Sequence, residues 1–221
     1  GGLPAALTPA VTLVVDYLSA FWNEPCYDSW EEHRSQLHTT TLASVAAGAR
    51  DIAPLVEPGQ AAAARSMHDS ARAFLVAECG VDGACVKYVG NEVVDSSHVW
   101  LATPLDIVAP TDPRMERTVA RIEAELLRGG VRRYAADTYY GGGQWVLLTA
   151  WLAWPRRRLG DEAGAAELLA WVEAQRDADG ALPEQVGWPG HHPYFYDYWT
   201  RTWGASARPL LWSHAMVVAA R

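Results

Sequence analysis

Apolar side chains recur at every third or fourth position through most of the chain, and no stretch alternates apolar and polar residues for the length of a strand. A spacing of three to four residues is the repeat of an amphipathic helix, whereas a half-buried strand repeats every second residue. Near the amino terminus, Val11, Val14, Val15 and Leu18 fall on one helical face. The pattern therefore predicts an all-α fold.

Proline, glycine and capping side chains mark the ends of the expected helices. Thr8-Pro9 and Asp112-Pro113 each place a capping oxygen before a proline in the first helical turn, and Gly129-Gly130 is a stop signal. A short helix is expected between Ser96 and Pro104. The other expected helices cover about 8–23, 33–51, 58–79, 111–128, 144–154, 161–176 and 205–220, which gives about eight helices joined by long aromatic-rich loops.

Length and charge exclude several classes of protein. The chain has 221 residues, 50% of them apolar and 20% charged, which is typical of one folded domain rather than of a disordered chain. Its net charge is -8 and it has no long basic stretch, so we expect no nucleic acid and no anionic membrane as a partner. No uncharged apolar run approaches the roughly 18 residues of a membrane-spanning helix.

The amino terminus and the cysteines bear on location. Gly1-Gly2-Leu3-Pro4 has neither an initiator Met nor the basic segment of a signal peptide, so we expect an internal cut and a cytoplasmic protein. Cys26, Cys79 and Cys85 are too few for a disulfide framework. We expect thiols, with a pairing of Cys79 and Cys85 across a short loop left open.

Two loops rich in glycine and aromatic residues are longer than packing alone requires, at 139–143 and 188–196. Much of the chain's stock of eleven Trp and nine Tyr gathers near them. Aromatic rings have flat apolar faces and polar edges that suit sugars, although many of these rings must fill the core. The loops indicate a binding site.

The sharpest local cluster is acidic, with Asp28, Glu31 and Glu32 at positions i, i+3 and i+4. On a helix these three carboxylates would share a face, and their crowding would keep one of them protonated as a general acid. A plainer explanation is an acidic helix start that complements the helix dipole. Both explanations stay open from the residues alone.

Two later segments add polar side chains. Glu184 lies beside Pro183 in a loop, which on its own indicates nothing. The segment 132–145 places Arg133, Asp137 and two tyrosines before a turn of three glycines. A phosphate-binding loop is not expected there, because no strand precedes the glycines and no Lys follows them.

Four motifs in order resemble glycoside hydrolase family 15, the glucoamylase-like family, over nearly the whole chain. They are Tyr27-Asp28-x-Trp30-Glu31-Glu32, Arg133-Tyr134-x-x-Asp137-Thr138-Tyr139-Tyr140-Gly141-Gly142-x-x-Trp145, Pro183-Glu184-Gln185 and Pro209-Leu210-Leu211-Trp212-Ser213-His214-Ala215. The resemblance implies an inverting exo-glucosidase on an (α/α)6 barrel that works without metal or organic cofactor on a small oligosaccharide. Inversion needs two carboxyl groups on opposite faces of the sugar, which two separate loops can supply.

The resemblance also implies roles for individual residues. Glu31 matches the general acid and Glu184 the general base. Asp28 is a candidate from its position alone, either to orient the attacking water or to cap a helix. The substrate-binding residues implied are Trp30 and Glu32 at the leaving sugar, Arg133 with Asp137 as its orienting partner, and Tyr139, Trp145 and Gln185 around them.

The helix count departs from the family's barrel. An (α/α)6 barrel has twelve helices, so we expect residues 1–221 to be the C-terminal two-thirds of one catalytic domain, completed by an N-terminal segment of the same polypeptide. Short α-1,6-linked glucosides such as isomaltose, or α-1,4-linked ones, are the expected substrates, with a trehalase or a non-catalytic sugar-binding module as alternatives. No metal site is expected, because the spacing of His33, His38, His191, His192 and His214 matches no ligand pattern.

Overall fold

The computed structural model describes residues 3–187 and 191–221, and the chain falls into two compact units. The first unit consists of Gly1–Glu92 and Trp100–Ala109, and the second of Val93–Val99 and Pro110–Arg221. The α-helices are α1 (Thr8–Phe21), α2 (Thr39–Ile52), α3 (Pro58–Glu78), α4 (Pro113–Leu126), α5 (Val146–Arg158), α6 (Glu162–Glu173), α7 (Pro193–Trp203) and α8 (Leu211–Ala220). Short 3-10 helices are η1 (Ala5–Leu7), η2 (Ala53–Leu55), η3 (Ser96–Leu101) and η4 (Tyr139–Gly141).

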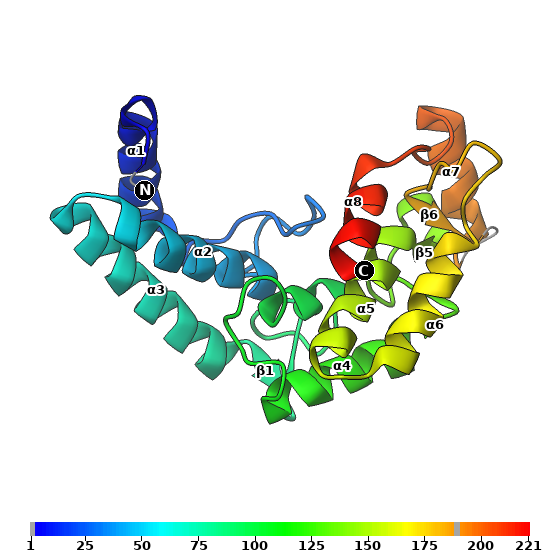
Figure 1. Ribbon diagram of the computed structural model, residues 1–221, viewed down its shortest axis with the longest axis horizontal. Helices are drawn as coiled ribbons and strands as arrows, with labels where there is room; N and C mark the ends of the chain where they lie inside the picture. The colour runs from blue at the N-terminus through cyan, green and yellow to red at the C-terminus, as the bar shows by residue number, and fades with distance from the viewer. Residues whose placement is uncertain (1–2, 188–190) are drawn as a thin grey trace. The chain divides into compact units, whose positions relative to one another are not determined.

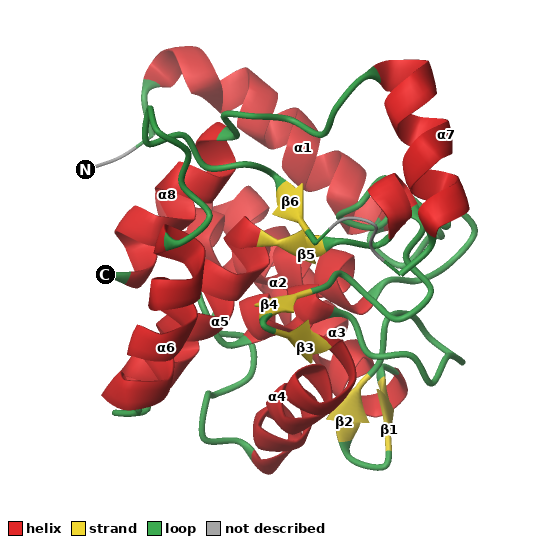
Figure 2. Cartoon of the chain, turned by 90° about the vertical axis from the view of Figure 1, so that its right-hand side faces the viewer, coloured by secondary structure: helices red, strands yellow, loops and turns green. Residues whose placement is uncertain are grey.

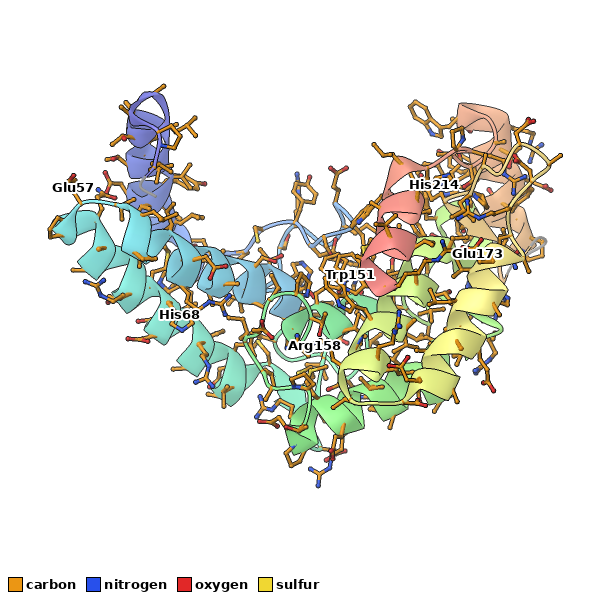
Figure 3. The ribbon with its side chains drawn as sticks, in the orientation of Figure 1. Glu57, His68, Trp151, Arg158, Glu173 and His214 are labelled. Atoms are coloured by element: carbon orange, nitrogen blue, oxygen red, sulfur yellow. The ribbon has the colours of Figure 1, made fainter. Side chains whose placement is uncertain are left out.

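In the first unit α2 and α3 run antiparallel, side by side (Figure 1). Their contact is lined by small residues, of which Ala43, Ala46, Ala64 and Ala71 are completely buried. Small side chains allow two helices to approach closely. His68 on α3 reaches the carbonyl oxygen of Ala46 on α2 at 2.8 Å (Figure 3).

Helix α1 packs on this pair through one face only. Its Val15 is buried against Ala53 and Ala64, whereas Leu13 is 69% exposed and Tyr17 60% exposed. Beside it, apolar side chains of α1, α2 and α3 line an open groove of about 310 Å³. The first unit thus carries an apolar surface that is larger than packing within the unit requires.

In the second unit α5 is the central helix, packed between α6 and α8. Most of its residues are buried, including Leu147, Leu148 and Leu152. Beside it lies a ladder of two-residue antiparallel strands in the order β3-β4-β5-β6, seen in Figure 2. The strands are β3 (Leu127–Arg128), β4 (Gly130–Val131), β5 (Gln144–Trp145) and β6 (Gln185–Val186). The ladder pairs Trp145 with Gln185 and so joins two of the sequence motifs.

The first unit contains one further pair of strands, β1 (Gly80–Val81) and β2 (Ala84–Cys85). The sequence pattern does not predict these two-residue strands, whereas the mostly helical content agrees with the predicted fold class. The two strand systems escape a sequence pattern search because a strand of two residues shows no alternation.

Most predicted helices are present, with four corrections. Thr8 is the first residue of α1 rather than its cap, which is Leu7, and the second helix begins at Thr39 rather than after Glu32. The segment from Ser96 forms a 3-10 helix. The predicted loop at 188–196 is wrong in part, because α7 begins at Pro193, while 188–190 lie outside the described residues.

Other boundaries shift by a few residues. Helix α5 continues through Pro155 to Arg158, and α8 begins at Leu211, later than predicted. The signal at α4 is correct, since the Asp112 carboxylate accepts a hydrogen bond from the Arg114 amide at 2.8 Å. No described helix is both long and apolar enough to span a bilayer.

Candidate active site

The acidic segment before α2 forms a closed turn. Asp28 Oδ1 accepts hydrogen bonds from the amides of Trp30 at 2.9 Å and Glu32 at 2.8 Å. The Asp28 amide in turn donates to the carbonyl oxygen of Glu32 at 3.1 Å. Short acidic side chains favour such turns because they bond the backbone two to four residues on. The prediction that Asp28, Glu31 and Glu32 share a helix face is therefore wrong, and so is the helix-start alternative.

Glu31 lies at the tip of this turn in a left-handed backbone conformation, with φ of 60°. Residues other than glycine adopt this conformation at a cost of about 1–2 kcal/mol, so neighbouring contacts must hold it. The Glu31 amide donates to the carbonyl oxygen of Asp28 at 3.1 Å, and the side chain is exposed. The turn presents a carboxyl group to solvent.

Asp28 is held from its other side by Lys87. The Lys87 ammonium lies 2.8 Å from Asp28 Oδ2, and the two side chains are 4% and 5% exposed. Both carboxylate oxygens of Asp28 thus bond groups of the protein itself. The structure gives Asp28 a role in shaping the turn; the idea that it caps a helix is wrong, and its action on the attacking water stays a prediction.

Trp30 and Glu32 flank Glu31 in the same turn, and both side chains are half-buried. The Trp30 ring packs against the buried Trp100, with ring centres 5.8 Å apart. This contact fixes one side of the turn. The predicted contacts of Trp30 and Glu32 with a leaving sugar stay predictions.

The second unit brings together the residues of the arginine motif. Arg133 Nε donates to Asp137 Oδ2 at 2.8 Å, and these side chains are 3% and 1% exposed. The guanidinium carbon lies 5.0 Å from the centre of the Tyr139 ring and 5.3 Å from that of Trp145. A buried ion pair with aromatic rings around its cation holds Arg133 in one orientation.

Glu184 lies against this cluster. Its amide donates to the carbonyl oxygen of Ala207 at 2.9 Å, and its Oε2 accepts from the Ser206 hydroxyl at 3.1 Å. Burial raises the pKa of Glu184, while the hydrogen bond from Ser206, the charge of Arg133 and the hydroxyl of Tyr139 each act to lower it. The result is a half-buried carboxyl group with several oriented neighbours.

The pKa of Tyr139 is also perturbed, in part by Glu184. Burial first, and then the charge of Glu184, raise the pKa of Tyr139 to about 12. The phenol therefore keeps its proton at neutral pH and can donate a hydrogen bond to Glu184. The Asp137 carboxylate also accepts from the Tyr139 amide at 2.9 Å, which ties Tyr139 to the Arg133 ion pair.

Gln185 and Trp145 lie at the inner edge of the cluster. Gln185 is 8% exposed, and its Oε1 accepts from the Gly143 amide at 3.1 Å. Trp145 is 5% exposed and stacks on Tyr139, with ring centres 5.9 Å apart. Both side chains support the cluster from within, and their contact with substrate stays a prediction.

Sequence reasoning missed two side chains that position the candidate carboxylates. Ser206 and Lys87 are far along the chain from the carboxylates that they contact and carry no local signal of that role, although Lys87 is the only lysine in the sequence. Ser213 donates to the carbonyl oxygen of Pro183 at 2.9 Å, and His214 Nε2 accepts from the Leu182 amide at 3.0 Å (Figure 3 labels His214). These bonds hold the backbone that leads to Glu184, so Ser213 and His214 of the fourth motif support its position.

The pair His191-His192 directly precedes α7. The amides of His191 and His192 both donate to the carbonyl oxygen of Gly141, which attaches this end of α7 to the glycine turn. Within the described ranges, 3–187 and 191–221, no three His, Cys, Asp or Glu side chains lie close enough together for a metal ion. None of Cys26, Cys79 and Cys85, all within those ranges, forms a disulfide.

Solved structures support the fold of the two units. A glycosidase variant in complex with glucose matches with a TM-score of 0.89 and 41% identity, over 94% of this chain and 57% of that one. A bacterial glucoamylase complexed with acarbose matches with a TM-score of 0.80 and 18% identity, over 97% of this chain and 37% of that one, which bears on the fold alone. The chain is thus mostly helical and matches family 15 structures of the (α/α)6 type over part of their length.

Sequence comparison gives the family. An isomaltose glucohydrolase of Kribbella flavida is 44% identical in an alignment 218 positions long, which covers 93% of this chain and 54% of the relative. The chain therefore spans about half the length of this relative. The family model of glycosyl hydrolases family 15 matches residues 4–184. Because that match covers most of the chain, from α1 to the Glu184 segment, the chain belongs to glycoside hydrolase family 15.

Proposed function

We propose that the protein containing this chain is an inverting, exo-acting α-glucoside hydrolase that releases β-D-glucose from the non-reducing end of short α-glucosides. The observation that carries this proposal is the setting of Glu184. It is a half-buried carboxyl group with a raised pKa, beside the Ser206 and Tyr139 hydroxyls and the buried Arg133 ion pair. A partly buried carboxyl group with a perturbed pKa is suited to act as a general base near neutral pH.

In the proposed reaction Glu31 is the general acid and Glu184 the general base. The Glu31 carboxyl gives its proton to the glycosidic oxygen as the bond from that oxygen to C1 breaks, and the bonding electrons stay with the oxygen. Glu184 removes a proton from a water molecule, whose oxygen forms the new bond on the opposite face of C1. Proton exchange with solvent then restores both groups. Inversion of this type requires the two carboxyl groups to be roughly 6.5–9.5 Å apart in the working enzyme.

The surrounding residues take the supporting roles. Arg133, held by Asp137, donates hydrogen bonds to sugar hydroxyls. Aromatic surfaces for the CH-rich faces of the sugar rings come from Trp30, Tyr139 and Trp145. The hydroxyl groups of the sugar are contacted by Glu32 and Gln185. The reaction as written needs no cofactor.

Isomaltose and related α-1,6-linked glucosides are the proposed substrates, ahead of α-1,4-linked ones. Support comes from the 44% identity with a protein named as an isomaltose glucohydrolase. The same relative extends well beyond the part that this chain matches. We therefore also propose that helices from elsewhere in the same polypeptide complete an (α/α)6 barrel and cover the exposed apolar side of α1.

The test uses the full-length protein with isomaltose, maltose, panose and trehalose, while proton NMR follows the anomer of glucose at early times. Release of β-glucose, fastest from isomaltose, is the expected result. Release of α-glucose would contradict the two-carboxylate inversion. Cleavage of trehalose alone would favour a trehalase, and binding without release from any of the four would favour a sugar-binding module.

A further inference from the structure

Lys87 is unusual in this chain. It is the only lysine of 221 residues, in a sequence whose other basic side chains are arginine and histidine. Its side chain is nevertheless only 4% exposed. Lysine is among the residues least often buried, because its charge loses hydration, and a buried lysine is normally paired.

The ammonium group of Lys87 connects directly to the turn that presents Glu31. It lies 2.8 Å from Asp28 Oδ2, and Asp28 Oδ1 accepts the amides on either side of Glu31, those of Trp30 and Glu32. One carboxylate thus links a fixed cation to both ends of a strained three-residue segment. The same link closes the turn in which Glu31 has its left-handed backbone, with φ of 60°.

The backbone of Lys87 is itself anchored to the start of α2. Its carbonyl oxygen accepts from the Thr39 amide at 3.2 Å, and the neighbouring Val86 carbonyl oxygen accepts from the Thr39 hydroxyl. The Val89 amide donates to the carbonyl oxygen of Leu37 at 3.0 Å. The cation is therefore held on a segment bonded at several points, rather than at the end of a mobile loop.

We propose that Lys87 is a positioning residue for the general acid: through Asp28 it holds the turn that aims the Glu31 carboxyl at the glycosidic oxygen. The proposal rests on the function assigned to Glu31 above. Loss of the ammonium leaves the Asp28 carboxylate buried without its cation, and such a charge is relieved by movement of the turn or by protonation. Either change disturbs the aim of Glu31.

The experiment compares two substrates in the full-length protein. Isomaltose has a poor leaving group that needs the proton from Glu31, whereas α-glucosyl fluoride releases fluoride, a weak base that leaves with the bonding electrons and needs no proton. For Lys87→Met we expect kcat on isomaltose to fall by about 10- to 100-fold with little change in KM, and kcat on the fluoride to fall far less. A merely structural role would lower both rates by the same factor, and that result would overturn the proposal.

Two further variants test whether the effect is specific to the position of the Lys87 ammonium group. Lys87→Arg keeps the charge, but its longer planar head must displace the Asp28 carboxylate, so the ratio of the two rates should fall here too. If Lys87→Met does not fold, an unchanged ratio in Lys87→Arg overturns the proposal. Arg50→Met, in the same unit, loses hydrogen bonds to the carbonyl oxygens of Leu105 and Asp106 and should leave the ratio unchanged.

The Glu31→Gln variant distinguishes a failure of the positioning role of Lys87 from a failure of Glu31 as the general acid. Glu31→Gln can lower the rate on isomaltose more than the rate on the fluoride while the Lys87 variants do not. In that case the positioning role of Lys87 is wrong, and the assignment of Glu31 as the general acid is retained. If Glu31→Gln lowers both rates equally, the assignment of Glu31 as the acid fails, and the positioning role fails with it.

Discussion

The Ser206 hydroxyl lies 3.1 Å from Oε2 of Glu184 and donates to it, although twenty-two positions separate the two residues in the sequence. A hydrogen bond donated to a carboxylate stabilises its charged form, so Ser206 lowers the pKa of Glu184 against the opposing effect of burial. The pKa of the proposed base is therefore raised by burial and lowered by Ser206 together with Arg133 and Tyr139.

Ser206→Ala should move the acidic limb of the kcat/KM profile to higher pH. A base works only when ionised, so activity is lost as pH falls through its pKa. Removal of a bond that lowers the pKa of Glu184 brings that loss to a higher pH. Ser206→Thr keeps the hydroxyl and serves as the control. A limb that does not move in Ser206→Ala would show that the bond has no effect on the base.

Glu184→Gln and Glu31→Gln should each lower kcat on isomaltose by about two to four orders of magnitude, because each removes a proton transfer in the transition state. Circular dichroism should show an unchanged helical fold. Glu173→Gln, at an ion-paired carboxylate at the end of α6 (Figure 3), is the matched control and should have near-normal turnover. Near-normal turnover in either site variant would remove that residue from the mechanism.

Arg133→Lys should lower kcat/KM by about tenfold to a hundredfold. A lysine keeps the charge but loses the paired hydrogen bonds to Asp137 and the flat contact with Tyr139. Arg132→Lys changes the adjacent arginine in the same way and should have a much smaller effect. Equal losses in the two variants would argue for general destabilisation instead.

Gly143→Ala should lower the free energy of unfolding by about 1–3 kcal/mol. A β-carbon there would lie 2.6 Å from both Oε1 of Gln185 and the backbone oxygen of Val186, and the backbone has little room to move. Gly59→Ala in α3, where nothing lies within 4 Å, should be neutral or stabilising. Urea unfolding of both variants measures the difference, and equal midpoints would contradict the predicted clash.

Sequence reasoning located the helices well where local chemistry marks them. At α4, the Asp112-Pro113 signal predicts the start that the structure has. It failed at the turn before α2, because an i, i+3, i+4 spacing of carboxylates looks the same on a helix and in a turn closed by Asp28. It also failed at α7, where aromatic residues near glycine and proline were expected to form a loop.

In the candidate site, too, some residues are marked by the local sequence and others are not. Motifs in the sequence pointed to Arg133 and Asp137, and the structure brings the two together as a buried ion pair. Nothing local marks Ser206 or Lys87, since each acquires its meaning from a partner that is distant in the chain. Contacts of this kind depend on tertiary folding and leave no period or spacing to read.

The strand ladder of the second unit has a consequence for assembly of the site. Trp145 pairs with Gln185 across a loop that contains all of α5 and α6, so the neighbours of Glu184 meet only after that helical hairpin has closed. Contacts between segments so far apart form late in folding, because the intervening chain must first lose its freedom. The proposed base therefore depends on the packing of this hairpin, which it contacts at one end, where the Val146 amide of α5 donates to the carbonyl oxygen of Glu184 at 3.2 Å. Substitutions inside that hairpin will therefore alter turnover by weakening the packing of α5 against α6, away from the residues proposed to contact the sugar.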